Sequence, residues 1–229
     1  MIKEKVVEIN KKLFDSGLVI LTWGNASAIV DDKIFIKPSG VPFNDLRPEM
    51  VSEVDLYSGS ALRGLKPSVD TNIHIELYRN FDNIGGIIHT HSTHCTAFAQ
   101  ANLSIPFLGT THADYFYGDI PVVSDISDYN IKNNYERNIG KSIVKYFEKN
   151  KIDPNKMQAA LIPSHGTMVW GETIDKAYEN AVVLEEIAKL AYMTLNLEEI
   201  CGKLSKPSKA LLDKHFFRKH GDSKYYGQQ

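Results

Sequence analysis

Three histidines stand where two short apolar segments end, and their spacing predicts a metal site. His89 and His91 end the segment that begins with the apolar residues 86–88, and His165 comes just after the apolar residues 159–163. Side chains two apart on a strand point to the same side, so His89 and His91 can chelate one ion. The pair alone is equally consistent with ordinary hydrogen-bonded histidines. The third histidine favours a metal, and three histidines leave zinc the open positions typical of catalytic sites.

A second set of residues carries the donor groups that bind phosphate. Amide, ammonium, hydroxyl and backbone N–H donors occur in predicted turns or at a predicted helix start, at Asn25, Lys37, Ser39, Gly40 and Ser68. Such donors together can hold a phosphate, and a helix start favours an anion. Each residue alone is a weak signal, because a Lys-Pro-Ser-Gly sequence is more often a simple turn.

Composition narrows the classes of protein to consider. The chain has 229 residues, 43% hydrophobic and 24% charged, with a formal net charge of -2. These values are ordinary for a globular protein and give no reason to expect nucleic acid or an acidic membrane as a partner. The first residues lack the apolar core of a signal peptide, and no apolar run is long enough to span a membrane. The two cysteines, Cys95 and Cys201, indicate no disulfide framework and fit a reducing cytoplasm. We expect Cys95 to be a small buried residue rather than a ligand.

Hydrophobic periodicity predicts the elements that must position these residues. We expect helices over residues 2–16, 69–80, 92–101, 133–149, from 173 onward and over 207–220. We expect strands over residues 18–22, 26–30, 33–36, 51–56, ahead of His89, and over 120–123, 159–163 and 167–170. No linker is rich in Pro, Gly or Ser, so one domain over residues 1–229 is favoured. Mixed helices and strands predict an α/β fold, or an α+β fold with a largely antiparallel sheet.

Two further segments concentrate polar and aromatic residues. Residues 110–118 lie between predicted elements, where functional groups often gather, although the aromatics could simply pack the loop. Tyr225 and Tyr226 stand near the C-terminus, where a frayed tail is the ordinary expectation.

With these segments in view, the chain resembles the L-ribulose-5-phosphate 4-epimerases of the class II aldolase and adducin-head superfamily. The resemblance covers nearly the whole chain in order. It rests on residues 21–25, 36–40, 89–92, 109–118, 164–166 and 211–227. The His-x-His pair alone would indicate only the superfamily. The sequence Thr-His-Ala-Asp-Tyr-Phe-Tyr-Gly and the tail are more specific to the epimerases.

The resemblance implies a single-domain α/β/α class II aldolase-like fold, with a central, mainly antiparallel sheet flanked by helices. It implies a cytoplasmic homotetramer with active sites between subunits and one zinc ion per subunit, other divalent metals being an alternative. The C-terminal tail, about residues 207–229, would complete a neighbouring subunit's active site. A pentulose phosphate would be the substrate, as in the catabolism of pentoses such as arabinose, with neither nucleic acid nor membrane as a partner.

The resemblance also implies roles for individual residues. The metal site would comprise His89, His91 and His165, with Asp70 as an acid beside the metal. Asp114, with Tyr226 from a neighbouring subunit, would be the two acid/base groups. The phosphate would be held by Asn25, Lys37, Ser39, Gly40 and Ser68. The tail residues His215 and Arg218 would reach across the subunit boundary. Val69 departs from the family pattern, which has Ser there, and so removes one hydroxyl.

The implied reaction interconverts L-ribulose 5-phosphate and D-xylulose 5-phosphate. The hydrogen on carbon 4 is not acidic, so reversible C3–C4 cleavage with re-addition to the other aldehyde face is the accessible route. Two acid/base groups on opposite faces are then required. An L-fuculose-phosphate-type aldolase is the nearest alternative, although Asp70 stands where those aldolases have Glu. A zinc hydrolase and a non-enzymatic, adducin-head-like interaction module are the further alternatives.

Overall fold

Seven antiparallel strands form one central sheet in the computed structural model, which describes residues 1–124, 126–221 and 224–227. The strands are β1 (Asn25–Val30), β2 (Lys33–Ile36), β3 (Ser52–Asp55), β4 (Ala61–Arg63), β5 (Gly86–Thr90), β6 (Ala159–Ile162) and β7 (Gly166–Gly171). Their spatial order is β4-β3-β2-β1-β5-β7-β6. The strand carrying His89, β5, therefore lies near the middle of the sheet, between β1 and β7.

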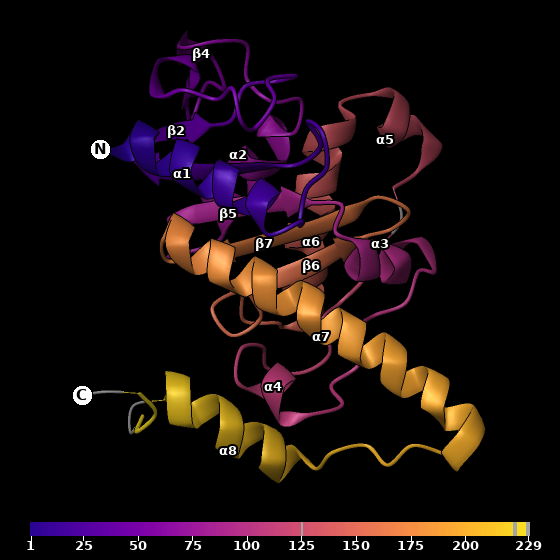
Figure 1. Cartoon of the computed structure of the whole chain (residues 1–229). Coiled ribbons are helices and arrows are strands. Elements are labelled where there is room, and N and C mark those ends of the chain that lie inside the picture. The colour runs from indigo at the N-terminus through magenta and orange to yellow at the C-terminus, as the bar shows by residue number, and fades with distance from the viewer. Residues whose placement is uncertain (125, 222–223, 228–229) are drawn as a thin grey trace.

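Helices cover both faces of the sheet, which makes the expected three-layer α/β arrangement (Figure 1). The helices are α1 (Ile2–Asp15), α2 (Thr71–Asn80), α3 (Thr93–Gln100), α4 (Thr110–Ala113), α5 (Asp128–Lys132), α6 (Tyr135–Asn150), α7 (Ile174–Cys201) and α8 (Lys209–His220), with a 3-10 turn at Pro48–Met50. In Figure 1, α1 and α7 cross in front of the sheet, and α2 and α6 lie behind it. None of the helices in the described ranges is long and apolar enough to cross a membrane.

Two glycines bring the longest helix, α7, onto the centre of the sheet. A Cβ added at Gly86 would lie 2.3 Å from the Cα of Ile174, and one added at Gly171 would lie 2.7 Å from the nitrogen of Ala177. Any larger residue would push α7 away from β5 and β7. The face of α7 that meets the sheet is apolar, since Ala177, Ala181 and Ala188 are all buried. This packing fixes the strand that carries His89.

The structure corrects some of the sequence-based expectations. Residues 18–22 form turns rather than a strand, because Leu21 has a left-handed backbone with φ of 55°. Residues 120–123 make only isolated bridges, Ile105 to Ile120 and Val122 to Leu161. Helix α2 begins at Thr71 rather than at residue 69, with Asp70 as its N-cap residue.

The C-terminal part of the chain forms a separate layer. After α7, residues 202–208 lead back to α8, which packs on α4 away from the sheet (Figure 1). Residues 224–227 fold back on the end of α8, where the N–H groups of Tyr225 and Tyr226 both donate to the carbonyl of Arg218. Residues 207–221 and 224–227, the described part of the segment predicted to act at a subunit boundary, thus lie against their own chain.

Candidate active site

The three histidines converge at one end of the sheet. His89 is on β5, His91 lies just after the end of β5, and His165 lies in the turn between β6 and β7. The three rings are mutually close, with centroids 4.8 to 4.9 Å apart. The Nε2 atoms of His89 and His91 are 3.0 Å apart, and one nitrogen from each ring lies within 4.8 Å of the others. They form a group able to hold a metal ion.

The turn that delivers His165 depends on two unusual backbone positions. Ser164 adopts a left-handed conformation with φ of 55°, which reverses the chain tightly after β6. A Cβ added at Gly166 would lie 2.5 Å from the carbonyl oxygen of Thr90. Glycine at this position therefore lets β7 begin directly beside the end of β5, where His91 follows. The close approach brings the third ring to the other two.

The protonation of the histidines suits metal binding. Nδ1 of His89 lies 2.9 Å from the carbonyl oxygen of Thr167. A carbonyl only accepts, so Nδ1 carries the proton and Nε2 keeps its lone pair for a metal. Burial, together with the nearby histidines, lowers the pKa of His91 and lowers that of His165 to about 4. Neutral imidazoles are the form that binds metal, and three nitrogens facing one point fit a zinc-like cation.

Asp70 lies in the same cavity but outside the three converging nitrogens. Its Oδ2 accepts hydrogen bonds from the amide of Asn25 at 2.8 Å and from the hydroxyl of Ser68 at 3.3 Å. Burial by itself raises the pKa of Asp70, but the neighbouring histidines and the Asn25 amide lower it overall. A carboxylate held in its charged form beside three histidines increases the attraction of the cavity for a cation.

All five residues predicted to bind phosphate line this same cavity, whose volume is about 340 Å³. It is lined by residues 22–25, 37–40 and 68–70 together with His89, His91 and His165. The predicted phosphate-binding residues and the three histidines come from separate parts of the sequence, and the fold brings them together. The cavity therefore combines a metal-ligand group with donors for an anion.

Lys37 is the cation of this cavity and is only 2% exposed. Its Nζ lies 4.6 Å from the centre of the Phe43 ring and donates to the carbonyl oxygen of Pro38 at 3.4 Å. Burial lowers the pKa of Lys37 to about 8, against an opposing attraction to Asp70. The ammonium has no carboxylate within salt-bridge distance among the described residues. An anionic ligand would supply that partner.

Two other side chains line the site without a binding role predicted from the sequence. The ring of Trp23 lies 6.5 Å from the ring of His91 and is 54% exposed at the rim of the cavity. Val69 lines the same cavity and is also exposed, and it stands where the family pattern has the hydroxyl of a serine. The position of Trp23 in a tight break between elements gave only a general signal that it lies on a functional loop.

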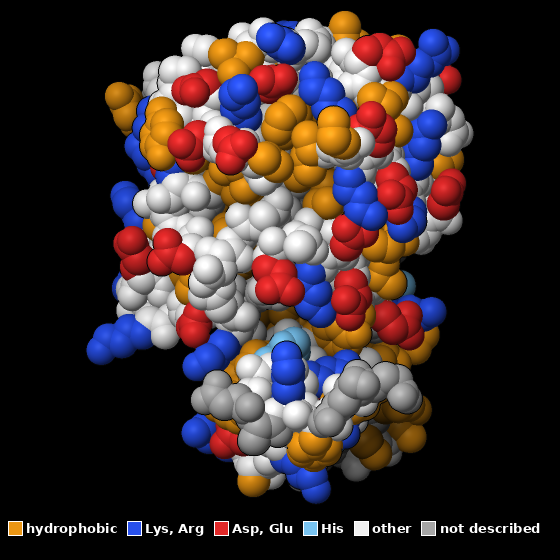
Figure 2. All heavy atoms as spheres, turned by 90° about the vertical axis from the view of Figure 1, so that its left-hand side faces the viewer, with side chains coloured by type: hydrophobic (Ala, Val, Ile, Leu, Met, Phe, Trp, Pro, Cys, Tyr) orange, Lys and Arg blue, Asp and Glu red, His pale blue; other side chains and the backbone are white. Residues whose placement is uncertain are grey.

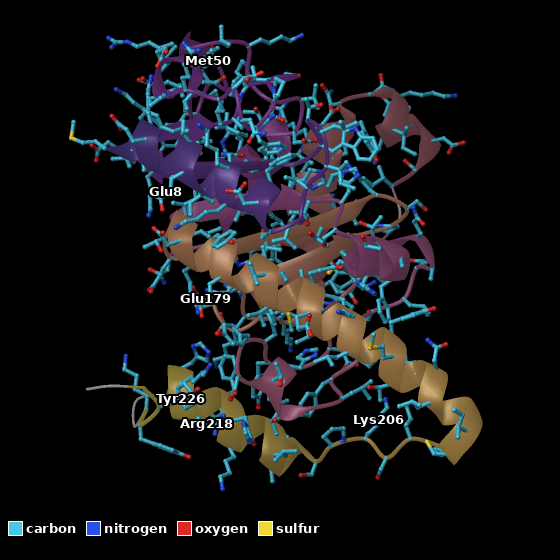
Figure 3. The ribbon with its side chains drawn as sticks, viewed as in Figure 1. Glu8, Met50, Glu179, Lys206, Arg218 and Tyr226 are labelled. Carbon is cyan, nitrogen blue, oxygen red and sulfur yellow. The ribbon has the colours of Figure 1, made fainter. Side chains whose placement is uncertain are left out.

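The remaining predicted residues form a second cluster. Both carboxylate oxygens of Asp114 accept hydrogen bonds from Arg218, the shortest 2.8 Å long, and Nδ1 of His215 lies 3.1 Å from one of them. The guanidinium of Arg218 in turn lies 5.0 Å from the centre of the Tyr226 ring. Figure 3 places Arg218 and Tyr226 together at the end of α8, with Glu179 on α7 above them.

This cluster borders a different cavity from the one that holds the histidines. Asp114 and Tyr226 line a hollow of about 1150 Å³ between α7 and the layer of α8. Lys176, Glu179 and Lys219 also line it, and Figure 2 shows side chains of both charges around the hollow that separates the lower layer from the body. Within one chain, the fold gathers Asp114, Tyr226, His215 and Arg218 but does not bring them to the histidines.

With this geometry established, the match to a known family is decisive. Residues 4–192 match the Class II Aldolase and Adducin N-terminal domain. The chain belongs to this family. The fold of this class II aldolase family member is also that of several solved structures. An L-fuculose 1-phosphate aldolase superposes with a TM-score of 0.79 at 22% identity, over 93% of each chain.

Two other solved structures give the same fold. YgbL from Escherichia coli, described as a putative aldolase/epimerase/decarboxylase, has a TM-score of 0.71 and 26% identity, over 93% of this chain and 96% of its own. The L-fuculose-1-phosphate aldolase from Thermus thermophilus has a TM-score of 0.68 and 22% identity, over 89% and 98%. The family and fold expected from the sequence are thereby confirmed, while these matches do not single out an epimerase.

Proposed function

We propose that this class II aldolase family member is a metal-dependent sugar-phosphate enzyme, and specifically an L-ribulose-5-phosphate 4-epimerase. One observation carries the proposal. The three converging histidines share a cavity with Asn25, Lys37, Ser39, Gly40 and Ser68, so one small molecule can contact a metal and place a phosphate on basic and hydroxyl donors. The favoured metal is zinc, because three neutral imidazoles match its ligand preference.

A bound zinc ion would supply Lewis-acid stabilisation of negative charge on the sugar oxygens as the C3–C4 bond breaks. The chain's own residues retain the cleaved fragment and the cation. The phosphate-binding residues hold the aldehyde fragment while it rotates, so that it is not released. Asp70 adds negative charge beside the metal-binding nitrogens, which strengthens retention of the cation.

Epimerisation further needs two proton-transfer groups at the C4 hydroxyl oxygen, one for each face of the aldehyde. We assign them to Asp114 and Tyr226, which share a cavity and are linked through Arg218. Because that cavity is not the histidine cavity of the same chain, the assignment requires a second subunit to bring the pair to the metal. This supports the proposal of a homotetramer with sites between subunits, in which residues 207–229 reach the neighbour. We place this oligomer in the cytoplasm.

The deciding experiment follows D-xylulose 5-phosphate formation from L-ribulose 5-phosphate by the zinc-loaded protein, with a chelated sample in parallel. We expect product only with metal. Cleavage of L-fuculose 1-phosphate instead would establish the aldolase alternative, which the fold neighbours make the first competitor. An inert protein free of metal would support an interaction module.

Two variants separate the metal site from proton transfer. His89→Ala should lose stoichiometric zinc and, with it, all turnover, as metal analysis and the coupled assay would measure. Tyr226→Phe should retain zinc but lose most epimerisation, since it lacks the phenolic proton. Undiminished turnover in Tyr226→Phe would remove Tyr226 from the mechanism, and zinc retained at full stoichiometry by His89→Ala would contradict the metal site.

A further inference from the structure

Strand β1 and helix α2 are joined by polar side chains in two successive rungs. In the first rung, the amide of Asn25 donates to Asp70 at 2.8 Å. In the second, Oγ of Ser27 lies 2.7 Å from Nδ1 of His74 and 2.9 Å from the hydroxyl of Tyr78. The first rung lines the candidate metal cavity, and the second lies directly behind it in the core.

The periodicities of the two elements explain this alignment. Asn25 and Ser27 are two apart on β1 and so point to the same face of the sheet. Asp70 and His74 are four apart at the start of α2, and the N–H of His74 donates to the carbonyl of Asp70 at 3.4 Å, so both lie on one side of the helix. His89 on β5 pairs directly with Asn25 on β1, so the two side chains share one face of the sheet. His74 therefore lies behind both Asp70 and a metal-binding histidine.

His74 has a polar atom without a partner. It is 0% exposed, and its Nε2 makes no hydrogen bond. Burial lowers the pKa of His74 to about 3, so the ring is neutral and has one donor and one acceptor nitrogen. An unpaired buried polar atom is costly, and such atoms mark places where a functional partner belongs.

The neighbours of the ring decide which nitrogen carries the proton. Ser27 can donate to Nδ1 only if it accepts from Tyr78, and the proton of His74 is then on Nε2. The opposite arrangement would leave a lone pair on Nε2 of a ring that lies close enough to Asp70 for the two groups to shift each other's pKa, and a lone pair and a carboxylate repel. The charge of Asp70 therefore favours the Nε2–H form, with Ser27 donating to Nδ1 and accepting from Tyr78.

We propose that His74 is a positioning residue for Asp70: Ser27 contacts its Nδ1, and the Nε2–H, which has no protein partner, holds the Asp70 carboxylate toward the metal through one bridging water. The inference rests on the proposed function, because it requires a metal beside Asp70. It adds to that function a buried residue that touches neither substrate nor metal. Carboxylates beside metals are commonly oriented by such hydrogen bonds, and losing one costs about 10- to 100-fold in metal affinity.

The test compares two amides that each mimic one ring nitrogen. The side-chain nitrogen of Gln occupies the place of Nε2, and that of Asn occupies the place of Nδ1. Zinc affinity of the full-length protein is measured by competition with a chromogenic chelator, after circular dichroism has confirmed folding. We expect His74→Asn to weaken zinc binding about tenfold and His74→Gln to stay within about threefold of the unchanged protein. A purely structural histidine would give equal losses in both variants, and that result overturns the proposal.

Two further measurements complete the test. In an Asp70→Ala background, which should itself weaken zinc binding, His74→Asn should cause no additional loss, because the carboxylate it positions is gone. If neither His74 variant folds, the Ser27→Ala variant tests the positioning role of His74 instead, since it should lower the zinc affinity of a protein that still folds. Unchanged affinity in Ser27→Ala, or additive losses with Asp70→Ala, would overturn the role of His74. Failure of the unchanged protein to bind zinc would instead overturn the metal site and everything that rests on it.

Discussion

At the residue scale, Lys37 shows how a cost in stability can serve binding. Its ammonium lies against the Phe43 ring inside the cavity, where burial lowers its pKa to about 8. Relative to an unfolded chain, this lowered pKa means that the folded protein holds the proton less tightly, so folding is penalised at neutral pH. A bound phosphate would reverse the penalty because it restores a counter-charge. The buried ammonium of Lys37 therefore favours the binding of an anion and does not stabilise the fold.

Lys37→Met, which keeps the length and apolar stem but removes the charge, tests this interpretation. We expect inorganic phosphate to bind about 10- to 100-fold more weakly, because one charge-assisted hydrogen bond is lost. Phosphate affinity of the unchanged protein should fall as pH rises through about 8, and the variant should not show this decline. Isothermal titration calorimetry at several pH values measures the phosphate affinity of both proteins and its pH dependence. A thermal midpoint lower than that of the unchanged protein would show instead that Lys37 serves the fold.

At the element scale, a carboxylate from α7 fixes the start of α3, directly after the candidate metal-binding pair His89 and His91. Oε1 of Glu185 accepts from the N–H of His94 at 2.9 Å, and Oε2 accepts from the N–H of Cys95 at 3.1 Å. The ring of His94 also contacts Glu185, with Nδ1 2.7 Å from Oε1. These bonds satisfy free N–H groups of the first helical turn with a negative charge, where the helix dipole favours one. Since α3 begins two residues after His91, Glu185 anchors the chain that leaves the site.

The contribution of Glu185 should depend on pH in a defined direction. Burial raises the pKa of this carboxyl, but the bonds from α3 outweigh it and the net pKa is lowered. Its stabilisation is therefore present above the unfolded-state pKa and is lost as pH falls through the lower folded value. We expect Glu185→Gln to cost about 1–2 kcal/mol at neutral pH and progressively less as the pH falls below about 4. Denaturant unfolding at several pH values measures this, and a cost independent of pH would contradict it.

At the scale of the whole molecule, the candidate metal site and the proposed proton-transfer groups line two different cavities of the chain. The metal-ligand group lies at the end of β5, and the cluster of Asp114 and Tyr226 lies in the layer of α8. An active site made from both cavities would need contact between two copies, and head-to-tail contacts whose rotation closes form a ring. The proposed tetramer is one such closed assembly, and the separation of the two cavities within one chain supports it.

Mixing two inactive variants tests this division. His89→Ala lacks the metal site but keeps Tyr226, and Tyr226→Phe lacks the proton donor but keeps the metal site. In a randomly mixed ring, about a quarter of the sites combine an intact metal half with an intact tail half. Co-expression should therefore restore about a quarter of the unchanged activity in the coupled assay. No recovery from mixed oligomers, shown to form by differently tagged copies, would place each site within a single chain.

The sequence by itself determined much of this protein, because its strongest signals are local. Each of these signals lies within a short stretch of sequence. They are the period-two spacing of His89 and His91, the apolar segments before the histidines, and the helical periodicity of α1 and α7. Asn25, Lys37 and Ser68 were predicted as phosphate donors from residue type and turn context, and the structure gathers them in one cavity. The family followed from motifs that are likewise contiguous.

Tertiary structure decided what depends on contacts between distant segments. No local pattern shows that the carbonyl of Thr167 sets the proton of His89, or that Glu185 reaches the start of α3 from α7. His74 had only its four-residue spacing from Asp70 as a signal, and its unpaired nitrogen becomes visible only when β1 and α2 pack together. The expected strand at residues 18–22 was wrong because Leu21 adopts a left-handed backbone and the chain turns there, while Leu18 and Val19 remain buried in the core.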